Sequence, residues 1–506
     1  MKLQEIILSA SAPSSSGSGS GSGSVSLHDI QTGSVLASFK QTSPALHCTA
    51  AVETRDSLGG FLLSCQRDKP ILNVYNFQKD QISLKVVLPE KLSCIAVDKQ
   101  GTYCAGATAQ GRIYLWEVAS GIMYNSWDAH YRRINVLRFT HDGAALLSGS
   151  EDSGVSVWSI SRLLDDDTQN QLPLPYCSLS DHTLPVTDIV CGVGNFPMCR
   201  VLTSSMDHSV KIWDLSSKSL LTTFQYPQAI TALTWDWTER LFFAASPDGS
   251  IHQTNLFRQH EDRSGLRTLE SIGGAGASDV VRIDETIREA QKKRLISIGQ
   301  EITCMSISLT SALLFVGTAA GLVHLIDIPT HQQLRTISTH KGLSITHLQV
   351  MLKPSDLVGH VDLSLYVRHG SDPKESIPVR PILAFQKMRD PKARENHDVS
   401  LMLPNGDQAL TKPVIYTMDE LLRDQSFFLQ SKTTPGANID DATTLKARTT
   451  ELENEVEQLK TQLGRAKSIN DAMWDNLVQR IVINEKAGDV DGGEGDDERK
   501  RKRSRT

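Results

Sequence analysis

Two sets of side chains each combine an imidazole, a hydroxyl and a carboxylate. The sets are His130, Ser148 and Asp152, and His182, Thr203 and Asp207. A trio of these types can activate a hydroxyl for acyl transfer. However, each Asp precedes a Trp by six residues (Trp158 and Trp213), and no Gly-x-Ser-x-Gly turn surrounds either hydroxyl. This pattern favours a structural network, in which indole N–H, hydroxyl and imidazole form a chain of hydrogen bonds that ends on the Asp.

Both Trp residues end short alternating segments, and a third such segment ends at Trp116. The three segments are 111–116, 154–158 and 209–214. Alternation of this kind indicates strands with one buried face. Weaker copies occur at 24–29, 71–75, 250–254 and 322–327. The chain therefore contains seven copies of one strand-like unit.

Each copy is accompanied by further strand signals. A run ending in small residues precedes it, a tight turn rich in Asp and Gly joins the two, and another alternating strand lies upstream. Units of three or four strands repeating about every 40 residues are propeller blades. Because the first copy lies too near the N-terminus to have all its strands, we expect residues 345–350 to supply the missing one and close the ring. A chain ending near Pro329 should then be unstable.

The repeats resemble the WD-repeat (WD40) family. His130, Ser148, Asp152 and Trp158 fall at the positions of the polar network of that family, and so do His182, Thr203, Asp207 and Trp213. The resemblance implies an all-β, seven-bladed WD40 β-propeller. The Trp116 copy departs from the pattern because Gln110 stands where Asp is expected, and the last copies lack the Trp. We expect those blades to depend on apolar packing.

Segments outside the repeat divide the rest of the chain. The propeller is predicted over 1–352, with a flexible Ser/Gly-rich loop at 11–24 and an insertion at 257–298 that includes a polar helix at 283–293. An extended linker region covers 353–438, and residues 381–386 within it are a candidate further strand.

A coiled-coil helix is predicted over 439–486. Leu445, Leu452 and Leu459 recur every seven residues, and Thr449, Val456 and Leu463 form a second set offset by four. The predicted partner contacts are Leu445, Leu452, Val456, Leu459 and Leu463. Pairing with a second copy, pairing with another protein and packing on the propeller of the same chain are the interpretations left open.

The tail at 487–506 is acidic first and basic last, a pattern typical of disordered segments. Its cations are Arg499, Lys500, Arg501, Lys502, Arg503 and Arg505. Such a cluster favours a nuclear-import signal over an RNA- or DNA-contacting tail or a merely solvated one.

Composition restricts the class of protein. The 506 residues carry a net charge of −6, which excludes a uniformly basic nucleic-acid coat. No apolar run approaches the roughly 18 residues of a membrane span, and the first residues do not resemble a signal peptide, so no membrane contact is expected. Cys48, Cys94, Cys104 and Cys304 lie in apolar alternating runs and are predicted to be reduced core residues. We expect no metal, no cofactor and no enzymatic activity, since no phosphate loop or ligand cluster occurs.

Further motifs narrow the resemblance. They are the Leu-His-Asp copy, the Asp128–Leu137 stretch, the turn at 148–153, the Ser180–Asp188 segment and the Ile302-Thr303-Cys304 blade. With the helical end of the chain, they resemble the WD-repeat subunits of the nuclear pre-60S ribosome-assembly complex. The resemblance covers about 1–350 well and thins over 257–298 and 353–430.

This resemblance implies a non-catalytic scaffold in the nucleus (nucleolus or nucleoplasm) that acts in pre-rRNA processing and late 60S maturation. Implied partners are helical-repeat subunits, pre-60S particles and a midasin-type AAA ATPase that the complex helps to recruit; RNA contact would be indirect. Self-association through the coiled coil is a further expectation. The alternative is a chromatin, heterochromatin or replication-licensing scaffold that uses the same surfaces.

Overall fold

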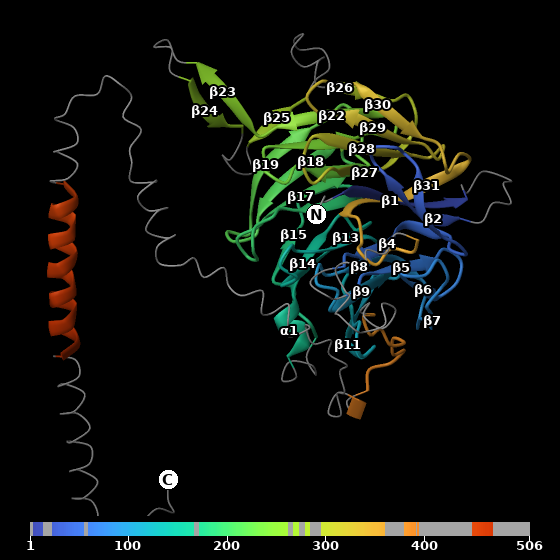
Figure 1. Ribbon diagram of the computed structural model, residues 1–506, viewed down its shortest axis with the longest axis horizontal. Coiled ribbons are helices and arrows are strands. Elements are labelled where there is room, and N and C mark those ends of the chain that lie inside the picture. Colours follow the sequence, from blue (N-terminus) through green and yellow to red (C-terminus); the bar gives the residue numbers. More distant parts are fainter. Residues whose placement is uncertain are drawn as a thin grey trace, which may run out of the picture. The chain divides into compact units, whose positions relative to one another are not determined.

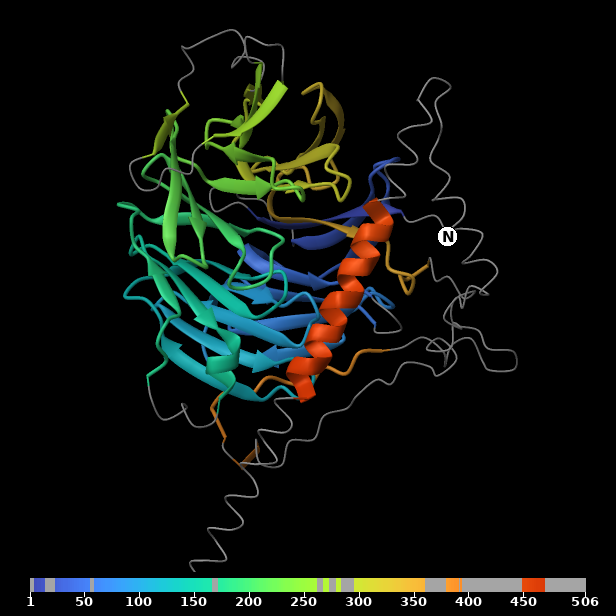
Figure 2. The same ribbon diagram turned by 90° about the vertical axis from the view of Figure 1, so that its left-hand side faces the viewer.

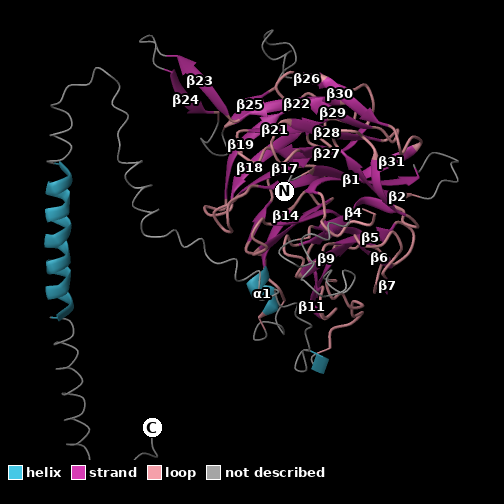
Figure 3. Ribbon diagram, in the orientation of Figure 1, coloured by secondary structure: helices cyan, strands magenta, loops and turns pink. Residues whose placement is uncertain are grey.

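The computed structural model describes ten stretches of the chain. They are residues 4–13, 23–54, 59–165, 172–261, 267–272, 279–283, 295–359, 379–390, 392–393 and 448–468. The chain divides into two compact units, Met1–Ala409 and Leu410–Thr506. Strands make up nearly all of the regular structure of the first unit (Figures 1 and 3), and the described part of the second unit is a helix.

Seven sheets form the blades of a propeller (Figures 1 and 2). Blade one contains β31 (Leu343–Leu352), β1 (Glu5–Pro13), β2 (Ser24–Asp29) and β3 (Val35–Phe39). Blade two contains β4 (Pro44–Val52), β5 (Phe61–Gln66), β6 (Ile71–Asn76) and β7 (Leu84–Val87). Blade three contains β8 (Leu92–Val97), β9 (Tyr103–Thr108), β10 (Arg112–Glu117) and β11 (Met123–Asp128).

The other four blades follow in sequence order. Blade four contains β12 (Ile134–Phe139), β13 (Ala145–Ser150), β14 (Val155–Ser159) and β15 (Cys177–Leu179), with α1 (Ile160–Leu164) after β14. Blade five contains β16 (Val186–Cys191), β17 (Arg200–Ser205), β18 (Ser209–Asp214) and β19 (Ser219–Gln225). Blade six contains β20 (Ala232–Trp235), β21 (Leu241–Ala245), β22 (Ser250–Asn255) and β26 (Leu295–Ser297). Blade seven contains β27 (Ile302–Ile307), β28 (Leu313–Thr318), β29 (Val323–Asp327) and β30 (Gln333–Ile337).

The first strand of each blade lies innermost and contacts the first strands of its two neighbours. These contacts run without a break through β31, β4, β8, β12, β16, β20 and β27 and return to β31. The seven repeat copies of the sequence are the third strands, β2, β6, β10, β14, β18, β22 and β29. The seven-bladed propeller predicted from the repeats is therefore confirmed.

Ring closure depends on a strand from the far end of the propeller. β31 pairs antiparallel with β1, from Glu5 opposite Leu352 to Pro13 opposite Leu343. Ile345 is fully buried, and Val350 is 7% exposed. The prediction that residues 345–350 close the ring is confirmed, and closure leaves no unpaired inner edge at blade one.

The predicted insertion at 257–298 contributes to two blades. Its first described part is a hairpin of β23 (Phe257–Glu261) and β24 (Arg267–Ser271), and β25 (Val280–Arg282) then pairs parallel to β19. β26 is the fourth strand of blade six, so the last residues of the predicted insertion belong to the propeller. The predicted polar helix falls on residues 284–293, outside the described residues, and Ile283 is not helical.

Residues 379–390 return to blade three and are here named the strap. No strand is assigned to them, which differs from the strand predicted at 381–386. The strap makes only two backbone hydrogen bonds to blade three, from Leu383 N to Val118 O (3.4 Å) and from Gln386 N to Gly121 O (2.8 Å). Pro381 has no N–H to add to such a ladder. The strap therefore lies along the blade as an extended segment (Figure 1).

The second unit contains a helix at 448–468, and every one of its residues is exposed. This supports the predicted helical extension; a coiled coil would need a second helix beside it. Among the described residues, no helix combines the length and apolar character needed to cross a bilayer.

Candidate functional site

The structure brings the four predicted residues of blade four into one chain of hydrogen bonds. His130 precedes β12, Ser148 lies on β13, Asp152 lies in the following turn, and Trp158 lies on β14. Trp158 Nε1 donates to Ser148 Oγ (3.0 Å), which lies 2.8 Å from His130 Nε2. His130 Nδ1 lies 3.0 Å from Asp152 Oδ2, so the carboxylate fixes the ring proton on Nδ1.

Blade five repeats this arrangement. Trp213 Nε1 donates to Thr203 Oγ1 (2.9 Å), Thr203 Oγ1 lies 2.8 Å from His182 Nε2, and His182 Nδ1 lies 2.9 Å from Asp207 Oδ2. Burial alone would raise the pKa of Asp207, but the hydrogen bond and charge of His182 lower it far below its ordinary value. The same causes lower the pKa of Asp152 to about 2.

The two hydroxyls cannot meet a substrate in this geometry. Ser148 and Thr203 are both fully buried. Each already accepts an indole N–H on one side and faces an imidazole on the other. An acyl group would have to displace the Trp, so these sets hold the blades together instead of activating a nucleophile.

The Asp side chains also fix the loops that lead into the inner strands. Asp152 Oδ2 accepts a hydrogen bond from Tyr131 N (3.3 Å), and Asp207 Oδ2 accepts one from Thr183 N (3.2 Å). Each network thus joins the third strand of its blade to the loop that leads into the inner strand.

In blade three, the strap contacts the tryptophan of the repeat in place of a polar network. Trp116 is fully buried, and its ring lies between those of Tyr114 and Phe385, with both centroids 5.3 Å away. Its Nε1 donates to Gln386 O (3.0 Å). The expected apolar packing is present, but the sequence did not indicate that a distant segment supplies it. Phe385, an aromatic residue in the short apolar run 381–386, was the available signal.

Blade one contains a third arrangement that the sequence analysis missed. Ser9 pairs with Ser26, and His28 stands two residues later, where blade four has Trp158. His340 Nε2 lies 3.0 Å from Ser9 Oγ, and His28 Nδ1 lies 3.3 Å from it. Burial, and then the neighbouring His340, lower the pKa of His28 to about 4. The two neutral imidazoles thus connect β1 and β2 to the loop before β31.

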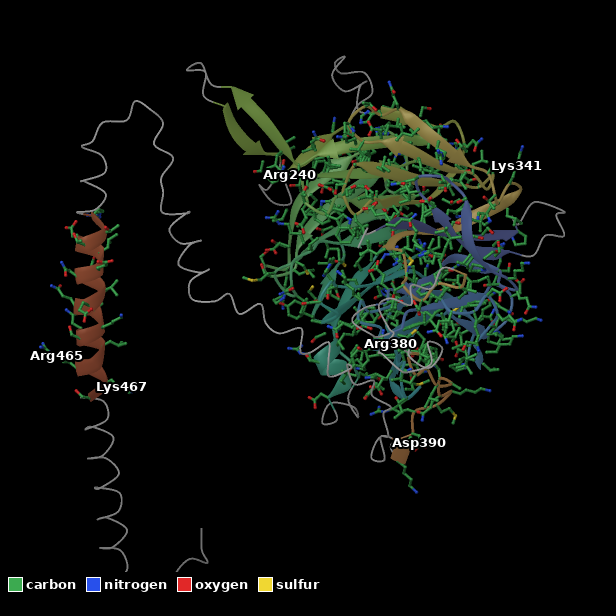
Figure 4. The ribbon with its side chains drawn as sticks, in the orientation of Figure 1. Arg240, Lys341, Arg380, Asp390, Arg465 and Lys467 are labelled. Atoms are coloured by element: carbon green, nitrogen blue, oxygen red, sulfur yellow. The ribbon has the colours of Figure 1, made fainter. Side chains whose placement is uncertain are left out.

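The predicted partner contacts on the helix form one apolar stripe. Leu452, Val456, Leu459 and Leu463 are 46%, 49%, 58% and 73% exposed. Their spacing places them on one face, and the same helix carries Arg465 and Lys467 near its end (Figure 4). Leu445 and the cations of the tail, Arg499 to Arg505, lie outside the described residues.

The thiols and acidic side chains of the described residues are not grouped as ligands of a cofactor. All eight cysteines are free, and Cys48, Cys94 and Cys104 are buried as the sequence predicts, whereas Cys304 is partly exposed. Within the stretches that the structure describes, no three His, Cys, Asp or Glu side chains are arranged to hold a metal ion.

Comparison with known proteins agrees with the geometry. The family described as "WD domain, G-beta repeat" matches residues 121–159 and 174–214, the two segments that contain the complete networks. Pre-rRNA-processing protein IPI3 of Mycosarcoma maydis is 34% identical, over 89% of this chain and 92% of its own length. The protein of the same name from Yarrowia lipolytica is 30% identical, over 89% and 96%. Human WD repeat-containing protein 18 is 32% identical, over 59% and 64%.

Proposed function

The chain belongs to the family of pre-rRNA-processing protein IPI3, and on that premise we propose that it is a non-catalytic scaffold subunit of a nuclear complex that processes pre-rRNA. The complex would act in late maturation of the 60S ribosomal subunit. Its partners would be helical-repeat subunits, pre-60S particles and a large AAA remodelling ATPase of the midasin type.

The length of the similarity is the observation that carries this proposal. A shared propeller would indicate only a protein with WD repeats, because that fold serves many functions. Here the similarity extends over 89% of the chain and 92% of the Mycosarcoma maydis protein. It therefore includes sequence beyond the repeats, where a general propeller has no counterpart.

The mechanism would be avidity. A closed ring is a rigid body on which several partners can dock, and the helix at 448–468 offers a second, separate contact. Two linked contacts raise the overall affinity for an assembly far above that of either contact alone. No bond has to be made or broken for this function.

The helix contributes through its apolar stripe, which is exposed on the isolated chain. Most helix stability in proteins comes from packing an apolar face, so this helix would be stabilised by burying Leu452, Val456, Leu459 and Leu463 against another helix. That helix would belong to a second copy of the chain or to a subunit of the complex. The basic residues at 499–505 would direct nuclear import, and deleting the last eight residues should abolish nuclear accumulation.

Affinity purification from nuclear extract tests the proposal. Full-length protein would be compared with a chain truncated at Pro435 and with the variant L452E/L459E, which places charges on the apolar stripe. The matched control N454E/T461E places the same charges on the opposite face of the helix. Co-purified proteins would be identified by mass spectrometry, and pre-rRNA would be quantified.

We expect the full-length protein and the control to retain pre-rRNA, large-subunit precursors and the ATPase. The truncated chain and L452E/L459E should lose them. Recovery of histones or replication factors without pre-rRNA would overturn the proposal in favour of a chromatin or replication scaffold. Equal retention by L452E/L459E and the control would refute the role of the helix.

A further inference from the structure

A cavity of about 930 Å³ opens at one end of the central channel. Its lining includes the beginnings of inner strands β4, β8, β27 and β31 and the residue before β12. The cavity is therefore the mouth of the ring, at the end where the inner strands start. Six of its lining residues are charged or apolar side chains that bear on binding, and these are Leu46, Arg67, Glu90, Lys91, Arg133 and Glu301.

Positive charge gathers on one side of this mouth. Arg67, Lys91 and Arg133 come from blades two, three and four, which are consecutive. Arg67 is directed by a hydrogen bond from its Nη1 to Pro13 O (3.1 Å). Lys91 and Arg133 are exposed, and neither forms an ion pair with a carboxylate among the described residues. Three cations on adjacent blades attract carboxylates that approach this side.

The carboxylates of the mouth do not cancel this charge. Glu90 lies 3.9 Å from Arg112 Nη1, and Arg112 also contacts Asp128 at 2.8 Å, so one cation is shared by two carboxylates. Glu301 comes from blade seven, which is two blades from blade two and three blades from blade four around the ring. The mouth thus has three cations on blades two to four against two carboxylates, Glu90 on blade three and Glu301 on blade seven, which leaves it net positive.

Exposed apolar groups accompany the cations. Leu46 in the cavity wall is 41% exposed, and Tyr131, two residues before Arg133, is 99% exposed. The loop that carries Tyr131 and Arg133 is held by the hydrogen bond from Tyr131 N to Asp152, so the polar network of blade four presents it in one conformation. Tyr and Arg on a preorganised loop are typical of binding hot spots.

We propose that this mouth binds an acidic peptide segment of a partner protein. Carboxylates of the segment contact Arg67, Lys91 and Arg133, and one apolar side chain packs on Leu46. The inference rests on the proposed scaffold function only in naming the occupant as a protein. A nucleic acid fits less well, because a phosphate backbone needs a long run of cations, whereas this mouth offers three cations beside the exposed apolar side chain of Leu46.

The test uses the purified full-length chain and a fluorescein-labelled twelve-residue peptide of Asp and Glu with one central Leu. Fluorescence anisotropy would measure its Kd at 50 and 200 mM salt for the wild type and for the variant K91E/R133E. The matched control K79E/K85E makes the same charge change on exposed lysines in blade two that do not line the cavity. Thermal melts of both variants would show that each is folded.

We expect K91E/R133E to weaken peptide binding at least tenfold and the control to change it less than twofold, with weaker binding at the higher salt. Absence of binding by the wild type, or equal losses in both variants, would overturn the proposal. So would a single-stranded RNA oligonucleotide that binds more tightly than the peptide and is released by the same variant. Because this assay contains no pre-rRNA or complex subunit, its result is independent of the purification that tests the proposed function.

Discussion

Removing the ring of Phe385 should release the strap from blade three. Phe385 is 4% exposed and stacks on Trp116 with a centroid distance of 5.3 Å. Phe385→Ala deletes this buried ring, whereas the two backbone hydrogen bonds of the strap remain available. The substitution therefore tests whether one aromatic contact holds a segment that has no strand pairing.

The expected free-energy cost of Phe385→Ala follows from the burial of the Phe385 ring. A buried Phe→Ala change costs about 3–5 kcal/mol, and the lost stack is part of that cost. Because the strap can detach while the ring stays closed, we assign this cost to local opening. About 4 kcal/mol corresponds to a population of detached strap that is about a thousandfold larger.

Hydrogen exchange read by mass spectrometry measures that population directly. The amide of Gln386 donates to Gly121 O at 2.8 Å, so its protection reports whether the strap is docked. In Phe385→Ala we expect protection of a peptide spanning 381–388 to fall by up to about a thousandfold. Peptides from blade five should exchange as in the wild type.

Leu383→Ala is the matched control. Leu383 is two residues away on the same strap, but its side chain is 54% exposed, so its loss should change protection little. Unchanged protection in Phe385→Ala would refute the reasoning, because the strap would then be held by something other than the stack on Trp116. Equal loss in both variants would show that any truncation loosens the segment.

Three further predictions concern the blades. Trp158→Phe removes the N–H that Ser148 accepts and should lower the free energy of unfolding, measured in urea, by about 1–2 kcal/mol. Trp127→Phe should cost less, because Trp127 Nε1 has no acceptor among the described residues. Equal costs for the two substitutions would contradict the network. A chain ending at Ser338 lacks β31, so its melting temperature should lie far below that of a chain ending at His360. Coincident melting curves would contradict ring closure by β31. The folded-state pKa of His28, about 4, lies below its ordinary 6.5, so the unfolded chain binds more protons as pH falls and stability should decline from pH 6.5 towards 4. His28 contributes about 3 kcal/mol of this decline, and His47 and His347, whose pKa values are also lowered by burial, add to it. His28→Asn should therefore make the decline shallower, and an unaltered pH profile would reject the role of His28.

The repeats made most of the propeller predictable. Third strands such as β14 and β18 alternate residue types along the sequence and follow turns with Asp, and these local signals predict a strand in each copy. The alternation predicted one buried face, whereas both faces of these strands are buried because neighbouring blades pack on each side. The missing strand of blade one was predictable because an incomplete blade requires a partner, and 345–350 was an alternating segment without a blade. The two complete networks were predictable because their residues lie within one repeat.

Other features depend on contacts that local sequence does not encode. The strap meets Trp116 from 270 residues away, and its candidate strand contains Pro381, so neither periodicity nor pairing identified its position. β25 is three residues long and pairs parallel to β19, which gives no recognisable pattern. His28 was missed because its blade departs from the Trp of the family pattern, and only the register with Ser9 shows the equivalence.

Two blades of the propeller depend on residues that come after blade seven in the sequence. Blade one obtains His340 and β31 from beyond blade seven, and blade three obtains Phe385 and Gln386 from later still. The predicted boundary at residue 352 therefore keeps the ring closed but removes the acceptor of the Trp116 N–H and one of its two stacking partners. A buried N–H without an acceptor costs about 1–3 kcal/mol. A chain ending at 360 keeps the buried Leu357 but lacks the strap, so it should melt below one ending at 390. The difference should disappear when Phe385 is replaced by Ala in the longer chain.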